Sequence, residues 1–205
     1  MDAVNNNDPS NDSPRTDGRR LRSEASRVRI VEALIAIIEE GHGLPSAEVV
    51  ATRAGVGLRT VFRLFEDMDG LYRSMQVVLT ERYSPLLELP GDTGEHWRER
   101  LSAMIGRRAG FYEAVMMLQV AAESQRHRSP ALQDGRTRLV RILREALIQV
   151  LPPALREDTV LVDALELSLS FEAWRRLRMD QHASPEAAEA VLRRLADVLL
   201  DGSTG

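Results

Sequence analysis

An all-α fold is predicted from this sequence of 205 residues, and three observations support the prediction. Apolar residues recur at the i, i+3, i+4 spacing of a helix along much of the chain, and no segment has a convincing strand pattern. Serine stands directly before proline at 129–130 and at 184–185, which is typical of a helix start. From about residue 95 onward, one helical pattern follows another. About nine helices are expected, as an N-terminal three-helix domain followed by a C-terminal helical bundle.

The composition is that of an ordinary globular protein. Hydrophobic residues make up 43% of the chain and charged residues 28%, close to the usual proportions. No apolar run approaches about 18 residues and no secretory leader is recognisable, so we expect a cytoplasmic protein without a membrane span. The absence of cysteine excludes disulfides, thiol catalysis and cysteine-ligated zinc.

The N-terminal segment differs from the rest of the chain. Residues 1–14 are rich in Asn, Asp, Ser and Pro, which predicts disorder. An arginine-rich stretch follows, and two interpretations of it remain open: an arm that touches DNA phosphates or the minor groove, or a solvated leader. Residues 1–21 are therefore assigned to a tail and arm. The arginines of the arm hypothesis are Arg15, Arg19, Arg20 and Arg22.

The first packed helix is predicted from an apolar stripe that ends shortly before Gly41. Its members follow the i, i+3, i+4, i+7, i+8 spacing of a helix face packed on a core. They are Ile30, Ala33, Leu34, Ile37 and Ile38. Gly41 is expected to end the helix, because glycine accepts the left-handed conformation that commonly follows a last helical turn.

A helix-turn-helix is predicted between Ser46 and Leu71. Ala51 supplies the small residue that lets two helices pack closely, and Gly55, four residues later, suits a turn that needs positive φ. Ser46 is a plausible N-cap of the first of these helices. The apolar positions expected to face the shared core are Val50, Ala54, Val56, Val61 and Leu64. Residues 22–71 are therefore predicted to form a DNA-binding domain.

The second helix of this motif, from about residue 58 to 64, is expected to lie in a DNA major groove. Arg59 and Arg63 fall outside the core positions, and arginine can read guanine with two hydrogen bonds. Ordinary solvated arginines are the alternative. Phe62 and Phe65 are favoured as core residues. The candidate DNA-contacting residues are Arg22, Ser46, Gly57, Leu58, Arg59, Thr60, Phe62 and Arg63.

The same stretch resembles the signature of the TetR family of transcriptional regulators. The matching residues are Ala54-Gly55-Val56, Thr60, Val61, Phe62, Phe65 and Leu71. The resemblance is specific over residues 22–72, and beyond that it rests on length and helical pattern. It implies a DNA-binding head, a C-terminal half that dimerises, and a small-molecule effector.

Three positions depart from the family pattern. Phe62, Leu64 and Met68 stand where the family usually has Tyr, His and Lys, which contact phosphates. Since each charged phosphate contact contributes to affinity and to its salt dependence, the resemblance implies weaker or differently anchored DNA binding. The acidic residues that follow, Glu66, Asp67 and Asp69, could cap the next helix or could repel DNA.

Residues 72–205 are assigned to an effector-binding and dimerisation domain. Helices are predicted over about 67–83, 95–108, 110–126, 130–151, 156–180 and 185–200. The last two carry apolar stripes wider than one core needs, which favours a second partner surface. The resemblance implies a dimer interface there, and burial within one subunit is the alternative. The candidate interface residues are Leu161, Leu165, Trp174, Val191, Leu195 and Val198.

The middle helices carry methionines and aromatic residues that could line a pocket for a small apolar effector. Plain core is the alternative. The candidate lining residues are Met104, Phe111, Tyr112, Met116, Gln119 and Phe171, with Gln119 or Glu123 as a polar anchor.

No catalytic motif, nucleotide loop or histidine cluster is recognisable, so no enzyme activity, cofactor or metal is expected. The prediction is a homodimeric transcriptional repressor that binds a palindromic double-stranded DNA operator and responds to an effector. Two rivals remain: a DNA-binding module without a ligand, and a helical protein that has lost operator binding and acts through protein partners.

Overall fold

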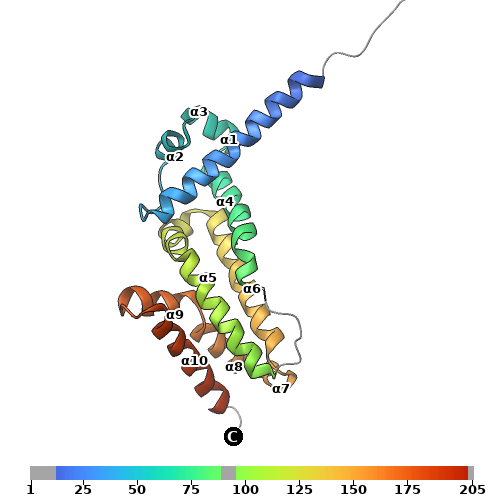
Figure 1. The fold of residues 1–205 in the computed structure, drawn as a ribbon, viewed down its shortest axis with the longest axis vertical. Coiled ribbons are helices and arrows are strands. Elements are labelled where there is room, and N and C mark those ends of the chain that lie inside the picture. The colour runs from blue at the N-terminus through green and yellow to red at the C-terminus, as the bar shows by residue number, and fades with distance from the viewer. Residues whose placement is uncertain (1–12, 89–95, 203–205) are drawn as a thin grey trace, which may run out of the picture.

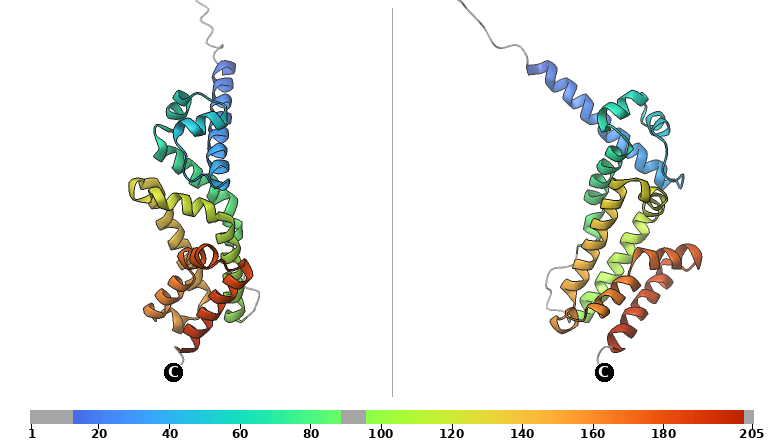
Figure 2. Two further views of the ribbon diagram at one scale, coloured as in Figure 1. Left: turned by 90° about the vertical axis from the view of Figure 1, so that its left-hand side faces the viewer. Right: turned by 180° about the vertical axis from the view of Figure 1, so that it is seen from behind.

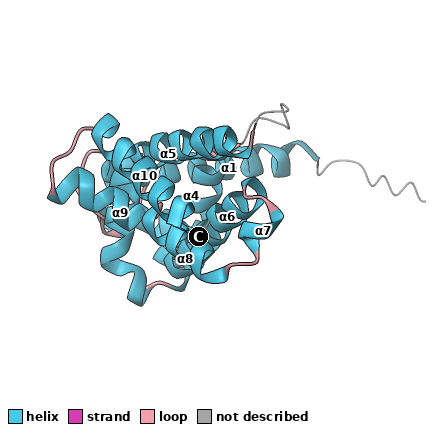
Figure 3. Ribbon diagram, turned by 90° about the horizontal axis from the view of Figure 1, so that it is seen from below, coloured by secondary structure: helices cyan, strands magenta, loops and turns pink. Residues whose placement is uncertain are grey.

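The computed structural model describes residues 13–88 and 96–202, with side chains from Arg20 onward. Within these ranges every regular element is helical (Figure 3). The α-helices are α1 Ser13–Glu39, α2 Ala47–Ala54, α3 Leu58–Phe65, α4 Met68–Tyr83, α5 Trp97–Gln125, α6 Pro130–Val150, α7 Pro153–Arg156, α8 Thr159–Ser168, α9 Phe171–Arg175 and α10 Pro185–Gly202. Shorter segments are the 3-10 helices η1 Ser84–Leu86 and η2 Arg126–Arg128, and the π-helix η3 Arg176–Asp180. The all-α prediction is confirmed.

The molecule is elongated, with α1, α2 and α3 gathered at one end (Figure 1). α4 leads from this head into a bundle with α5 and α6, and it crosses the predicted domain boundary at residues 71 and 72 without a break. α8, α9 and α10 lie at the other end of the molecule, where α10 packs on α5 and α8 (Figure 2).

α1 begins at Ser13, earlier than the sequence predicted, so the arginine-rich stretch is helical from there on. Most of the disorder predicted for residues 1–14 lies outside the described residues. The predicted apolar stripe of α1 is buried along its whole length. Gly41 ends the helix as predicted, with φ of 86° and its N–H 2.9 Å from the carbonyl oxygen of Ile38.

The two helices predicted over 95–108 and 110–126 are one continuous helix, α5. Gly110, near the expected break, costs about 1 kcal/mol of helix stability relative to alanine. Tertiary packing outweighs that cost, because α5 is buried on opposite faces against α6 and α10. Leu118 and Ala109 are both buried, although the nine residues between them correspond to about 180° of rotation around the helix.

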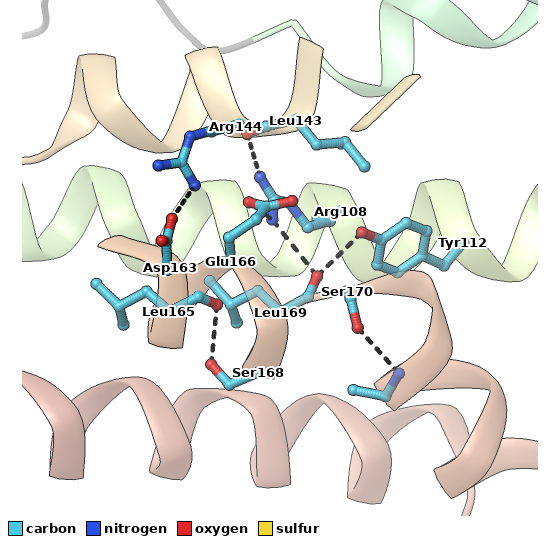
Figure 4. A network of polar contacts seen from close by, with 11 residues as sticks. Arg108, Tyr112, Leu143, Arg144, Asp163, Leu165, Glu166, Ser168, Leu169 and Ser170 are labelled. Carbon is cyan, nitrogen blue, oxygen red and sulfur yellow. Dashed lines mark hydrogen bonds and ion pairs between the residues drawn. The ribbon is translucent and has the colours of Figure 1, made fainter. Parts of the chain in front are cut away.

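The single helix predicted over 156–180 is instead divided into α8, α9 and η3. The chain breaks at Leu169 and Ser170, where Ser170 caps α9 by accepting a hydrogen bond from the N–H of Ala173 at 3.2 Å. The carbonyl oxygen of Leu169 leaves the helical pattern and accepts from the Tyr112 hydroxyl at 2.9 Å and from Arg108 at 3.4 Å (Figure 4). The break therefore has specific partners on α5.

Arg108 is the centre of this network although it is only 1% exposed. Its guanidinium also donates to the carbonyl oxygen of Leu143 at 2.5 Å and lies 3.3 Å from the carboxylate of Glu166. Burial raises the pKa of Glu166, against the opposing effect of Arg108. A buried charge is tolerated only when it is paired and hydrogen-bonded, and Arg108 meets both conditions while joining α5, α6 and α8.

Candidate nucleic-acid interface and ligand pocket

The turn between α2 and α3 has the geometry that the helix-turn-helix pattern predicts. Gly55 adopts φ of 65° and ψ of 38°, a left-handed conformation that favours glycine. The N–H of Gly55 bonds to the Thr52 carbonyl at 3.2 Å, and the N–H of Val56 bonds to the Ala51 carbonyl at 3.0 Å. This pair of bonds satisfies the last carbonyls of α2 and turns the chain into α3.

α3 has one buried face and one free face. Val61, Leu64 and Phe65 are buried, as the sequence predicted. Arg59 and Arg63 are exposed and lie together on the opposite face. The preference for Phe62 as a core residue is wrong, because this side chain is 42% exposed and stands between the two arginines in sequence.

The other candidate DNA-contacting residues lie near the N-terminal ends of α2 and α3 or on α1. Gly57 occupies the N-cap position of α3 and is exposed, whereas Leu58 and Thr60 are half-buried. Ser46 is the N-cap residue of α2, yet its side chain makes no capping hydrogen bond. Arg22 is exposed on α1. The side chains of Arg15 and Arg19 lie outside those that are described.

Two of the three departures from the TetR pattern are explained by packing. Leu64 is buried and Met68 packs against the core, so neither side chain is free to face DNA. The interpretation as a lost phosphate contact is therefore not supported for Leu64 and Met68, and for the exposed Phe62 it stays a prediction.

Arg27 positions α3, a role that the sequence analysis did not predict. From α1 its guanidinium donates to the carbonyl oxygen of Leu64 and lies 4.9 Å from the ring centroid of Phe65. Both contacts are at the C-terminal end of α3, where a cation is favoured by unpaired carbonyls. The arginine fixes the end of α3 that carries Arg63.

Two acidic residues after α3 stabilise the fold through hydrogen bonds. Asp67 caps α4 by accepting from the Gly70 N–H at 2.7 Å. Asp69 faces α6, where it accepts from the Ser129 hydroxyl and from the Ala131 N–H at 3.2 Å. The capping interpretation is confirmed for Asp67, and Asp69 ties the start of α4 to the start of α6.

A cavity of about 320 Å³ lies between α4, α5 and α6. α4 contributes Met75, Leu79 and Tyr83 to the cavity wall, one side chain from each successive helical turn. Gln76 also lines it and donates to the Ala131 carbonyl at 2.7 Å. The volume is at the lower end of the range for small-molecule sites.

Only part of the predicted lining reaches this cavity. Phe111 and Gln119 line it, whereas Glu123 is exposed and lies outside it. The predicted residues that do not line the cavity are Met104, Tyr112, Met116 and Phe171. All four are core residues. Tyr112 packs on Phe171 of α9, with 5.6 Å between the ring centroids, so this side chain of α5 points away from the cavity.

Solved structures of similar shape were found by comparison. A transcriptional regulator from Rhodococcus sp. Rha1 matches with a TM-score of 0.68 and 22% identity, over 86% of this chain and 97% of its own. A TetR-like transcriptional regulator from Rhodococcus sp. RHA1 matches with a TM-score of 0.62 and 19% identity, over 86% and 96%. The multidrug binding protein EbrR matches with a TM-score of 0.54 and 23% identity, over 82% and 88%.

The chain has the TetR-like fold. This agrees with the resemblance found in the residues of the helix-turn-helix. No protein-family model matches the sequence, and no curated protein matches it significantly.

In this TetR-like fold, α8 and α10 leave a set of apolar side chains exposed. They are Val160, Leu167, Val191, Leu195 and Val198. Of the candidate interface residues, Val191, Leu195 and Val198 are thus exposed. Leu161, Leu165 and Trp174 are instead buried in the core of the subunit, so that part of the predicted interface is corrected. Trp174 also donates to a Glu113 carboxylate oxygen at 3.2 Å, which gives it a structural role.

The described residues hold neither a metal-binding cluster nor a membrane-spanning helix. No group of three His, Asp or Glu side chains there is arranged to hold a metal ion. No helix within residues 13–88 or 96–202 is both long and apolar enough to cross a membrane.

Proposed function

We propose that this protein is a ligand-responsive transcriptional regulator, a cytoplasmic repressor that binds a palindromic operator as a homodimer. The observation that carries the proposal is the free face of α3. Arg59, Phe62 and Arg63 are exposed there, while the opposite face is held by the core and by Arg27. A rigid helix that presents two arginines is suited to the major groove.

The chemistry of this face fits base recognition. Arginine can donate two hydrogen bonds to guanine, and an aromatic side chain can contact the methyl group of thymine. No ion pair or hydrogen bond holds Arg59 or Arg63 among the described residues, so their guanidinium groups are free to bind. This favours operator binding over the rival in which that activity has been lost.

Dimerisation would place two such helices at a fixed distance. A dimer reads two half-sites about one helical turn of DNA apart, or a multiple of it. The exposed apolar residues of α8 and α10 are the surface that supports a homodimer, because apolar side chains gathered on two packed helices gain stability when a second copy covers them.

The contacts of α4 suggest how an effector would act. α4 begins directly after α3, and Asp69 and Gln76 tie it to the start of α6 through Ser129 and Ala131. The cavity lies along the same helix. A ligand that fits better when α4 is tilted would change the separation of the two recognition helices, and DNA would weaken ligand binding by the same factor. The cavity counts against the ligand-independent rival.

The first test is selection of bound sequences from random double-stranded DNA, followed by affinity measurements on the selected sequence. A two-fold symmetric motif is expected. Arg59→Ala and Arg63→Ala should each weaken binding by about 1–3 kcal/mol and relax the preference at one position per half-site. Arg141→Ala, an exposed arginine on α6, is the control and should bind like the unchanged protein. Unchanged affinity in both α3 variants would contradict the proposal.

A further inference from the structure

We infer that the cavity between α4, α5 and α6 binds an amphipathic anion, with an apolar body and a carboxylate or phosphate head on Arg126. The inference rests on the proposed function in that it names the chemical class of the effector. It concerns binding to the cavity and can be tested without DNA.

Most of the cavity lining is apolar, and its uncharged polar members are Gln76, Thr80, Tyr83, Ser84 and Gln119. Apolar side chains from all three helices contribute, and they offer little hydrogen bonding to a ligand. They are Met75, Leu79, Phe111, Val115, Leu118, Ala122, Leu132, Leu139 and Ile142. Such a lining gains stability by removing a hydrocarbon chain or ring from water.

The polar end of the cavity is positive. Arg126 follows the last residue of α5 and is half-buried at the cavity wall. Its Nε atom is buried without a hydrogen-bond partner in the described part of the chain, and no ion pair with another described residue neutralises the guanidinium. A buried guanidinium N–H without an acceptor is unfavourable, and an anionic head offers both charge and acceptor atoms.

Arg136 on α6 strengthens this polarity. One of its nitrogens pairs with Glu172 on α9, while its Nη1 atom is buried and has no partner among residues 13–88 and 96–202. Arg138 also lines the cavity and is exposed. The lining therefore offers three guanidinium groups, of which one is already paired.

The acidic residue of the lining, Glu88, lies toward the opposite end. It follows η1, beyond the C-terminal end of α4, and α4 alone rises about 10 Å between Gln76 and Tyr83. Arg126 belongs to the turn before α6, whose first residues are held by Asp69 and Gln76 of α4 through Ser129 and Ala131. The cavity is thus positive at the end beside η2 and the start of α6, which disfavours a lipophilic cation.

The test uses four probes with the same ten-carbon chain, titrated calorimetrically into the full chain below their micelle concentrations. Decanoate and decyl phosphate carry anionic heads, decanol is neutral and decylammonium is cationic. At least one anion should bind about tenfold or more tightly than decanol, and decylammonium should bind most weakly. The two anions also distinguish a carboxylate ligand from a phosphate ligand.

Variants then locate the head. Arg126→Met should reduce the affinity of the preferred anion to that of decanol, with decanol unchanged, and Arg126→Lys should keep part of the preference. Arg128→Met, an exposed arginine in the same turn that does not line the cavity, should have no effect. Ala122→Phe should fill the cavity and weaken anions and decanol together. Thermal unfolding of each variant checks that it is folded.

Equal affinity of decanol and both anions would overturn the inference, as would an anion preference that survives in Arg126→Met or a failure of all four probes to bind. A regulator that selects operator DNA but shows one of these results retains its proposed function and loses only this ligand class. If the protein selects no DNA but binds anions through Arg126, the ligand inference stands and the proposed function fails.

Discussion

Gly70 and Gly110 are both helical glycines, but their surroundings are opposite. A Cβ atom at Gly70 would overlap the carbonyl oxygen of Phe65, at the tight turn where α3 passes into α4. At Gly110, in α5, a Cβ atom would meet nothing within 4 Å. Glycine is required at the first position because backbone approaches backbone there.

The two glycines predict opposite stability changes. Gly70→Ala should lower the free energy of unfolding by about 1–3 kcal/mol, because the overlap can be relieved only by moving backbone. Gly110→Ala should raise it by up to about 1 kcal/mol, since alanine is the better helix former. Urea denaturation measures both. A tolerated Gly70→Ala would show that the α3–α4 turn is more adaptable than its geometry indicates.

Arg108 is the residue on which the packing of α8 against α5 depends. Arg108→Met should cost about 3–5 kcal/mol, because it leaves Glu166 without its partner and the carbonyls of Leu143 and Leu169 without a donor. Arg107→Met, the exposed neighbour on the same helix, should cost little. Equal losses in the two variants by urea denaturation would contradict the role given to the buried network.

At the scale of elements, α3 illustrates how a short helix is held in place. Eight residues are too few to form a stable helix alone. The buried Val61, Leu64 and Phe65 supply the tertiary contact, and Arg27 holds the C-terminal end. The free face can therefore be rigid without making contacts of its own.

Arg27→Met should test this anchoring. Loss of the charged hydrogen bond to the Leu64 carbonyl should lower the free energy of unfolding by about 1.5–3 kcal/mol. DNA affinity should fall as well, since Arg63 lies one position before the anchored residue. Arg29→Met, an exposed arginine on the same helix, is the control. Unchanged DNA affinity in a destabilised Arg27→Met would show that α3 keeps its orientation without the anchor.

At the scale of the whole molecule, the head and the far end of the bundle have separate tasks. α3 lies at one end of the molecule and α8 and α10 lie at the other, with α4 leading from the head toward them (Figure 1). α4 lines the cavity, and the exposed apolar residues belong to α8 and α10. This separation allows the two ends to be tested independently.

The homodimer proposal predicts that one charge on the exposed face of α10 separates the subunits. Leu195→Glu should give monomers in sedimentation at micromolar concentration, because a charge buried in an apolar interface is costly. Val77→Glu, at an exposed apolar position on α4, should leave the dimer intact. An unchanged protein that sediments as a monomer would contradict the proposal itself.

The sequence by itself determined the local features of this protein. Gly41 and Gly55 end their helices with positive φ, and Ser129 and Ser184 cap the helices that begin at the following prolines. These features depend on residues a few positions apart, so their chemistry can be read directly. The all-α class and the core face of α1 follow from periodicity in the same way.

Only the tertiary structure decided which apolar side chains meet which partner. Phe62 is exposed, Leu165 is buried in its own subunit, and Tyr112 packs in the core while Phe111 lines the cavity. The break at Leu169 likewise depends on Arg108, 61 residues away. Periodicity identifies an apolar face but carries no information about what covers it, because that depends on contacts between helices distant in sequence.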